Sequence, residues 1–362
     1  MAGEPVQRRL QYVLEHFDKQ SIDNVVLNYF SLANEVYTIT TREGRFVVKN
    51  CFKNNSRELV ANEAALIQFL NDHQVSCPKL IPTRTGALFL EYDGQFFIMN
   101  EFVDGSVPKW HDQLNESLMR ETMHAMADFH RATEYFEPPF EPHRMAALAI
   151  PQATQWLNNL QPSLVQDRSG RQSVALMLTI VDELLQHGAT LQAKLETIDL
   201  SVLKKVFIHG DLHCFNLIFS ADHQHYNAIL DFDFIREDYR LVDFFWATRS
   251  MIRGYWFEAL YGFSPRAHED RVSDAQLQAA TSRAVAFMID SYRAYHSLPD
   301  AEIRLLPLFA EALPFYTVRF FKLSNSEEEC LDHASWFRHQ LDTMAQTVRH
   351  LEVAVEQFLA PD

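Results

Sequence analysis

The stretch "FIHGDLHCFNLIF", residues 207–219, places polar, chemically able side chains between two apolar runs. The runs 206–208, 216–219 and 228–232 are short and rich in β-forming residues, so they predict short strands in a mostly helical region. Polar residues between such strands lie on loops that a rigid frame holds in place, an arrangement typical of catalytic and binding sites. The residues concerned are His209, Asp211, His213, Asn216, Asp231 and Asp233.

Upstream of this stretch, the chain changes from a β-rich to a helical pattern. The first hundred residues predict one helix, 56–73, and five mostly antiparallel strands, at 24–30, 35–41, 45–52, 87–92 and 95–102. Apolar residues at helical spacing predict helices at 116–132, 173–198 (closing or bending near Gly188), 274–295, 305–323 and 336–359. We therefore predict an α+β fold, with an N-terminal lobe over 1–102, a hinge at about 100–105 and a larger helical lobe over 103–362.

A lysine and a glutamate of the N-terminal lobe are expected to meet. Glu63 lies on the apolar face of its predicted helix, since it follows Leu59 by four residues and precedes Ile67 by four. Lys49 alternates with Val47 on one face of the neighbouring strand. An inward carboxylate needs a cation or hydrogen-bond donors, so a Lys49–Glu63 ion pair is predicted. The alternative is that both charges are simply solvated.

Composition excludes several classes of protein. The chain has 362 residues and a formal charge of −16, so its average field repels nucleic acid and favours cationic or neutral partners. We find no export signal and no run of about 18 uncharged apolar residues, which predicts a cytoplasmic protein with no membrane partner. The ten glycines lie too far apart for a G-x-G-x-x-G or Walker A pattern. The cysteines, including Cys214, indicate neither a disulfide framework nor a close-spaced zinc motif.

The polar residues of the opening stretch have the spacing His-x-Asp-x-x-x-x-Asn, with Asp231 fifteen residues further on. Phosphoryl transfer needs a carboxylate near the attacking hydroxyl, oxygen ligands for Mg²⁺ and a lysine on the nucleotide phosphates. Asp211, Asn216 with Asp231, and Lys49 supply these parts. Two alternatives stay open: a zinc site built on His209, Asp211 and His213, and a purely structural role in capping strands and satisfying loop amides.

The combination of "HGDLHCFN", "ILDFDF", the "VVK" strand and the glutamate-bearing helix resembles a known family of enzymes. It is similar to the aminoglycoside phosphotransferase, choline kinase and homoserine kinase superfamily, which has the protein-kinase fold. The similarity extends over about residues 25–320. It is greatest to the phosphotransferase enzyme family, which includes type II homoserine kinases and a stress-response Ser/Thr kinase.

The resemblance implies roles for individual residues, with ATP and Mg²⁺ as cofactors. Asp211 is the catalytic base, Asn216 and Asp231 bind Mg²⁺, Lys49 contacts the α- and β-phosphates, and Glu63 fixes Lys49. Residues 100–103 are the hinge that meets adenine: Asn100, Glu101, Phe102 and Val103. Asp233 assists the metal or its water shell, and Asp243 braces the loop. His209 and His213 shape the loop, and Cys214 packs within it.

One departure from the family concerns the loop that covers the phosphates. "FSLANEVY", residues 30–37, has no glycine, so backbone amides near residues 33–36 and the Asn34 side chain are expected to take its place. The departure leaves a catalytically weak, nucleotide-binding pseudokinase open as an alternative, beside a stress-response type of Ser/Thr protein kinase.

The main expectation is an ATP-dependent kinase that phosphorylates a hydroxyl of a small molecule. The acidic chain favours an aminated acceptor, of the homoserine, choline, amino sugar or aminoglycoside type. Residues 137–172 form an insertion or cap, and the helix around Glu311, Tyr316 and Arg319 faces the acceptor. A monomer or homodimer is expected.

Overall fold

The structure is a computed structural model whose residues group into two compact units. Unit 1 comprises residues 1–143 and 207–236, and unit 2 comprises residues 144–206 and 237–362. The chain crosses between the units after residue 143, within β6 (Lys205–Ile208) and within β9 (Arg236–Tyr239), and the two short strands β6 and β9 pair with each other. The predicted division into lobes 1–102 and 103–362 stays a prediction. The structure describes residues 4–19, 21–28, 34–51, 56–108, 115–141, 144–167, 169–251, 272–318, 321 and 326–361.

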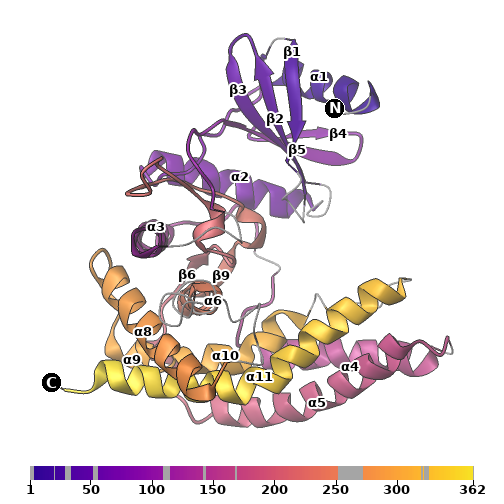
Figure 1. Ribbon diagram of the computed structural model, residues 1–362. Helices are drawn as coiled ribbons and strands as arrows, with labels where there is room; N and C mark the ends of the chain where they lie inside the picture. Colours follow the sequence, from indigo (N-terminus) through magenta and orange to yellow (C-terminus); the bar gives the residue numbers. More distant parts are fainter. Residues whose placement is uncertain are drawn as a thin grey trace. The chain divides into compact units, whose positions relative to one another are not determined.

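Unit 1 is built on a five-stranded antiparallel sheet, as the sequence predicted (Figure 1). The strand order is β1-β2-β3-β5-β4. β2 and β3 form a hairpin in which Thr41 pairs with Gly44 and Glu35 pairs with Asn50. The strand bounds are β1 Ile22–Leu27, β2 Glu35–Thr41, β3 Gly44–Asn50, β4 Leu90–Tyr92 and β5 Gln95–Glu101.

A helix that the sequence analysis missed, α1 (Glu4–His16), covers one face of this sheet (Figure 1). Its spacing is helical: Leu10, Val13, Leu14 and, just beyond the helix, Phe17 are buried in a core with sheet residues. Burying each such side chain contributes about 2 kcal/mol. The opposite face of the sheet, which carries Lys49, is therefore the one left for the site.

Helix α2 (Arg57–Asp72) carries Glu63 and confirms the helix predicted at 56–73. Asn62, which precedes Glu63 on α2, fixes the helix to the segment after α3 (Glu116–Thr133). The Asn62 amide accepts from the Phe140 N–H and donates to the Phe140 carbonyl, both at 3.0 Å. The helix that presents Glu63 is therefore held at a defined position.

Short strands follow in unit 1, around the polar loop. β7 (Leu217–Phe219) and β8 (Tyr226–Ile229) pair in antiparallel fashion, and 3-10 turns form at Cys214–Asn216 and Phe232–Phe234. α3 packs against β8, and its Met119, Met123 and Met126 are fully buried, as core packing predicts.

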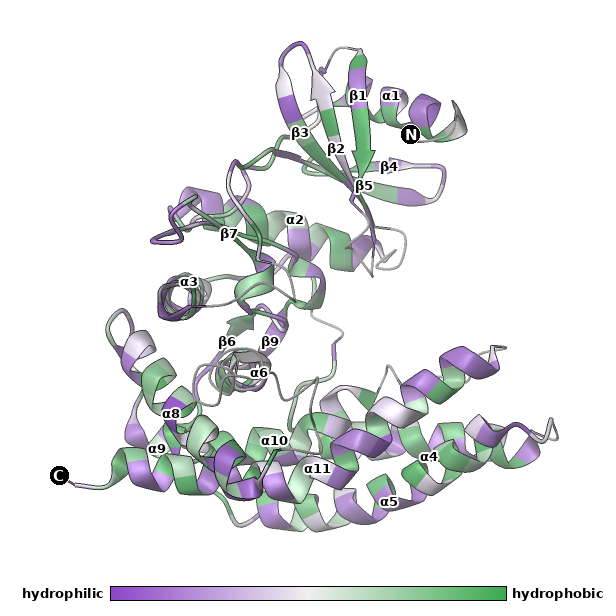
Figure 2. Cartoon of the chain, viewed as in Figure 1, coloured by the Kyte–Doolittle hydropathy of each residue, from purple (hydrophilic) through white to green (hydrophobic). Residues whose placement is uncertain are grey.

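Unit 2 is a set of packed helices, in which hydrophilic and hydrophobic residues alternate around α5 and α11 (Figure 2). α5 runs unbroken through Gly188 to Leu195, so the predicted closure there is wrong. A Cβ at Gly188 would meet Thr154 and the ring of Phe315, so this glycine serves close helix packing. The bounds are α4 Ile150–Gln166, α5 Gln172–Leu195, α6 Leu241–Met251, α8 Asp274–Arg293, α9 Asp300–Ile303, α10 Leu306–Tyr316 and α11 Glu327–Leu359.

By length and composition, α5 alone among the described helices could cross a membrane. This is weak support for a membrane span, because the core helix of a folded unit passes the same test, and α5 packs against α4 and α11. The absence of a membrane partner stays a prediction.

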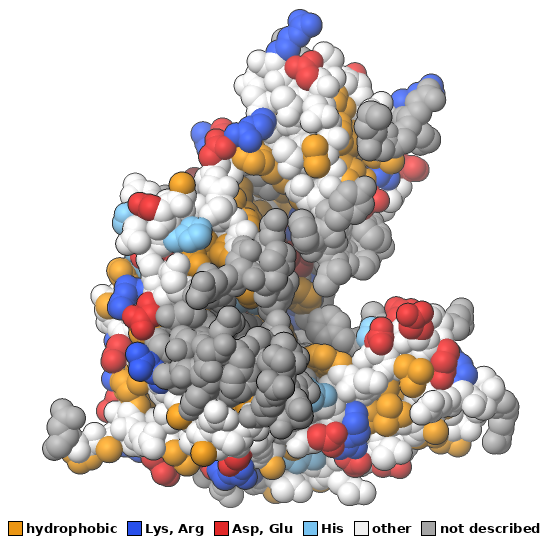
Figure 3. Space-filling model, in the orientation of Figure 1, with side chains coloured by type: hydrophobic (Ala, Val, Ile, Leu, Met, Phe, Trp, Pro, Cys, Tyr) orange, Lys and Arg blue, Asp and Glu red, His pale blue; other side chains and the backbone are white. Residues whose placement is uncertain are grey.

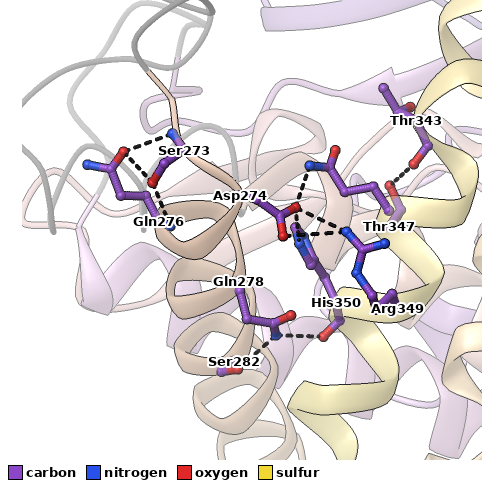
Figure 4. Close-up of polar contacts among 10 residues, drawn as sticks. Ser273, Asp274, Gln276, Gln278, Ser282, Thr343, Thr347, Arg349 and His350 are labelled. Atoms are coloured by element: carbon purple, nitrogen blue, oxygen red, sulfur yellow. Dashed lines mark hydrogen bonds and ion pairs between the residues drawn. The ribbon is translucent and has the colours of Figure 1, made fainter.

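A polar cluster joins the start of α8 to α11 (Figure 4). The Asp274 carboxylate accepts a hydrogen bond from Gln346 at 2.7 Å and lies 2.9 Å from His350 Nε2 and 3.2 Å from Arg349. Gln278 donates to the His350 carbonyl at 3.0 Å. These contacts fix the register of the two helices. On the face seen in Figure 3, acidic and basic side chains are interspersed over the coloured surface.

Candidate active site

The loop between β6 and β7 is held to the chain after β8 by a buried histidine. His209 is fully buried, and its Nε2 lies 2.8 Å from the backbone oxygen of Leu230. Because a carbonyl oxygen only accepts, this nitrogen carries the proton and donates. The His209 ring also packs against Phe129 and Phe232, with ring centroids 5.8 and 5.3 Å away. His209 thus holds the loop in shape, the role that was predicted for it.

Asp211 is oriented by two residues of the same loop. Asn216 Nδ2 donates to the Asp211 backbone oxygen at 2.8 Å and to its Oδ2 at 3.2 Å. His213 Nε2 lies 3.4 Å from Asp211 Oδ1. The backbone oxygen of Asn216 in turn accepts from the Leu230 N–H at 2.9 Å. The loop therefore presents a fixed carboxylate, which suits a group that must take a proton from a bound hydroxyl.

Gly210, between His209 and Asp211, has no room for a side chain. Its φ is +81°, and a Cβ would lie 2.5 Å from the Phe234 carbonyl oxygen. We expect Gly210→Ala to lower the free energy of unfolding by about 2 kcal/mol or more, from backbone strain plus displacement of the loop. Gly86→Ala is the matched control, because Gly86 also has φ +81° but open space around it. Denaturant unfolding that gives equal losses for the two variants would contradict the proposed steric role.

Lys49 of β3 and Glu63 of α2 form the predicted ion pair, with Nζ and Oε1 2.6 Å apart. Both side chains are buried, and Lys49 also contacts the Asp233 carboxylate. Burial by itself lowers the pKa of Lys49, but the carboxylates of Asp233 and Glu63 outweigh it and hold that pKa well above its ordinary value. The ammonium group therefore stays charged at any physiological pH.

Asp233 is more central than its sequence suggested, since it lies between Lys49 and Asn34. Asn34 Nδ2 donates to both carboxylate oxygens of Asp233, at 2.8 and 2.7 Å. Asp233 is also buried, so these donors and the Lys49 ammonium compensate its charge. The signal that could have found this role is the "DFDF" spacing, which places a second carboxylate two residues after Asp231.

Asp231, directly before the 3-10 turn at Phe232–Phe234, has a left-handed backbone with φ 63°. The pKa of its carboxyl is raised to about 7 by loss of water around it and by repulsion from Asp233, with Asp211 adding to the repulsion. The residue is exposed to solvent, and its carboxyl is repelled by the carboxylates of Asp233 and Asp211. Three carboxylates thus lie close enough to repel one another, and Lys49 is the cation that faces them.

This crowding predicts a pH-dependent stability for the metal-free protein. The folded-state pKa of about 7 lies above the ordinary 3.8, so proton binding by Asp231 favours the folded state at low pH. That contribution is lost as the pH rises through about 7. We expect metal-free Asp231→Asn to melt at a higher temperature than wild type at pH 8, with a smaller difference at pH 5.

Asp93→Asn is the control for this prediction, because Asp93 is an exposed aspartate that also has positive φ, 53°. Asparagine tolerates the left-handed region, so neither variant adds backbone strain. Melting curves of wild type and Asp231→Asn that stay parallel from pH 5 to pH 8 would contradict the assignment.

The oxygen donors of this site fit a divalent cation of the Mg²⁺ type. Asn216 donates from its Nδ2 to Asp211, so its Oδ1 is the atom that would hold such an ion, and Asp231 would supply a carboxylate. A bound cation would also relieve the repulsion between the carboxylates. Among the described residues, no group of three or more histidine, cysteine, aspartate or glutamate side chains is arranged to hold a metal, so the zinc alternative stays a prediction.

Cys214 lies in the loop as a packed thiol rather than a nucleophile. It is buried, and burial raises its pKa to about 12. The reactive thiolate is therefore scarce at neutral pH. The four cysteines are present as thiols.

In the predicted hinge at the end of β5, some backbone N–H groups already donate hydrogen bonds to other backbone groups. The Glu101 N–H donates to the Lys79 carbonyl at 2.9 Å, and the Phe102 N–H donates to the Arg45 carbonyl at 3.2 Å. For the Val103 N–H, no backbone acceptor is found within the described residues. After Glu101 and Phe102, the next N–H group of the hinge that could donate to a ligand is therefore that of Val103.

Several predicted residues lie elsewhere. Residues 30–33 of the predicted phosphate loop and Arg319 are outside the described residues. In unit 2, Glu311 binds Lys194 at 2.5 Å, and Tyr316 and Asp243 are buried. Their roles in acceptor binding or loop bracing stay predictions, as does the cap at 137–172, where the structure shows α4.

The profile of the phosphotransferase enzyme family matches residues 31–271, more than half of the chain. The chain therefore belongs to the phosphotransferase enzyme family, and the predicted family, kinase-like fold and enzyme class are confirmed. No curated protein matches the chain.

Solved structures with the same fold include three small-molecule phosphotransferases, and each covers at least 94% of both chains. An aminoglycoside phosphotransferase from Alicyclobacillus acidocaldarius is 18% identical over 96% of both chains, with a TM-score of 0.60. The microcompartment-associated aminopropanol kinase is 18% identical over 96% of this chain and 99% of its own, with a TM-score of 0.63. The amicoumacin kinase hAmiN, in complex with AMP-PNP and Ca²⁺, is 17% identical over 94% of both chains, with a TM-score of 0.62.

Proposed function

We propose that this enzyme transfers the γ-phosphate of ATP, with Mg²⁺, to a hydroxyl of a small, amine-bearing molecule. The observation that carries the proposal is the Lys49–Glu63 pair joined through Asp233 to the chain that also presents Asp211, Asn216 and Asp231, all within unit 1. A charged lysine fixed by carboxylates suits phosphate oxygens, and a fixed aspartate suits a proton acceptor.

In this proposal each residue has one task. Lys49, fixed by Glu63, binds the α- and β-phosphates, and Asn34 lies in the loop over the phosphates, directly before β2. Asp211 accepts the proton of the attacking hydroxyl. Asn216 and Asp231 would hold Mg²⁺, which neutralises charge on the phosphates when bound.

The adenine would lie at the hinge, residues 100–103. Its ring edge is read there by backbone groups, and Val103 is the donor that supports this placement.

Two observations support an amine-bearing acceptor: the charge of the chain and the substrates named for two proteins of the same fold. The chain has a formal charge of −16, which favours a cationic acceptor. Two proteins of the same fold act, by name, on aminoglycosides and aminopropanol, which are amine-bearing alcohols. A monomer or homodimer in the cytoplasm remains part of the proposal.

An ADP-release assay over a panel of acceptors tests the function. The panel contains homoserine, choline, amino alcohols, amino sugars, aminoglycosides and a generic Ser/Thr protein substrate. We expect release that depends on a small amine-bearing acceptor and on Mg²⁺. Release that depends on the protein substrate alone would support the protein-kinase alternative. Absence of Mg·ATP binding by calorimetry would support the pseudokinase alternative.

A further inference from the structure

The sheet of unit 1 has one face that carries Lys49, and strand register identifies the other residues on that face. Lys49 of β3 lies opposite Val36 of β2 and opposite Ile98 of β5. Val47 lies opposite Asn100 in the same β3–β5 pairing. Side chains of directly paired residues in antiparallel strands point to the same face, and alternate residues of a strand share a face. Val36, Val47, Lys49, Ile98 and Asn100 therefore lie together.

Asn100 is the amide on this otherwise apolar strip beside Lys49. It follows Ile98 by two residues, so it lies roughly 7 Å along β5 from the partner of Lys49. It is also the first residue of the hinge and is followed by Glu101 and Phe102, whose N–H groups donate to the carbonyl groups of Lys79 and Arg45. Asn100 therefore lies at the hinge end of this sheet face, and Lys49 lies further from the hinge on the same face.

The position of Asn100 is fixed, but its side-chain oxygen is not satisfied. The residue pairs with Val47 on one side and with Leu80 on the other, so its backbone is held by two neighbours. Its Oδ1 is buried and has no hydrogen-bond partner among the described residues. A buried carbonyl oxygen without a donor is uncommon in folded proteins and is accounted for when a ligand supplies the donor.

We propose that Asn100 reads the 6-position of the purine, with Oδ1 accepting a hydrogen bond from the 6-amino group of adenine. This inference rests on the proposed function, because it needs the phosphates at Lys49 and the base at the hinge. It assigns selectivity to a side chain of the hinge, beyond the backbone contacts expected there. The apolar Val36, Val47 and Ile98 provide surface for the flat base, and Asn100 provides the polar contact at its edge.

A binding cycle that compares two nucleotides and two proteins tests the role of Asn100. Dissociation constants of ATP and of purine riboside triphosphate, which lacks the 6-amino group, are measured by calorimetry without an acceptor. We expect wild type to prefer ATP, and Asn100→Leu to reduce that preference by about tenfold. Backbone contacts contribute equally in both proteins and cancel in this comparison.

Two further variants complete the test. Asn24→Leu, at an exposed asparagine of β1 in the same sheet, should keep the wild-type preference. Asn100→Ser also removes the amide and replaces Asn100→Leu if the latter fails to fold. An equal preference in wild type and the Asn100 variants would overturn the assignment while leaving the nucleotide site intact. A wild-type protein that binds neither triphosphate would overturn both the assignment and the proposed function.

Discussion

Asp211→Asn is expected to lower the rate of acceptor phosphorylation by about a thousandfold, because general base catalysis typically contributes that much. Asparagine keeps the shape of the side chain but cannot accept a proton at neutral pH. The Asn216 contact with the backbone oxygen of residue 211 also remains, so the loop should keep its conformation. We therefore expect kcat to fall while the Kd for Mg·ATP and the melting temperature stay close to wild type.

The control for this change is Asp290→Asn, at an exposed aspartate on α8. It alters the net charge of the protein by the same amount and should leave kcat unchanged. Acceptor-dependent turnover of Asp211→Asn within tenfold of wild type would contradict the assignment of Asp211 as the base.

Lys49→Met is expected to have the largest effect on stability, lowering the free energy of unfolding by about 4 kcal/mol. The substitution removes the cation that lies between two buried carboxylates, Glu63 and Asp233. An uncompensated buried charge is costly, whereas methionine fills a similar volume. Binding of Mg·ATP should be lost as well, and both effects are measured with denaturant unfolding and calorimetry.

A surface pair provides the comparison for Lys49→Met. Lys79 lies 3.8 Å from Glu101, with both side chains more than half exposed, so Lys79→Met should cost less than about 1 kcal/mol. Adding Glu63→Met to Lys49→Met removes one of the two uncompensated carboxylates and should recover part of the loss. Equal costs for the Lys49 and Lys79 variants would contradict the view that the Lys49 cluster is buried and coupled.

The Lys49–Glu63 pair shows what local patterns can predict. Strand alternation put Lys49 on one face of β3, and helical spacing put Glu63 on the inner face of α2. Each pattern fixes the face on which one side chain lies, and the need to neutralise a buried charge predicts that the two side chains pair. The five strands were predictable for the same reason, since β-branched runs separated by Asp93-Gly94 and Glu43-Gly44 leave few other arrangements.

Tertiary packing decided what the sequence patterns did not. Gly188 suggested that the helix closes or bends there, yet α5 continues past it, and the glycine allows close contact with Thr154 and Phe315. The link from Asp233 to Asn34 and Lys49 joins residues nearly 200 positions apart, and no local period reports such a contact. Likewise, the buried oxygen of Asn100 becomes visible only when strand register and neighbours are known.

Phosphoryl transfer to a hydroxyl with Asp211 as the base is tested by following label from ATP, labelled at the γ-phosphate, to an acceptor found in the panel. We expect wild type to move the label to the acceptor hydroxyl in the presence of Mg²⁺, and Asp211→Asn to leave the label on ATP. Label that wild type releases only as inorganic phosphate, or that Asp211→Asn transfers as fast as wild type, would contradict this expectation.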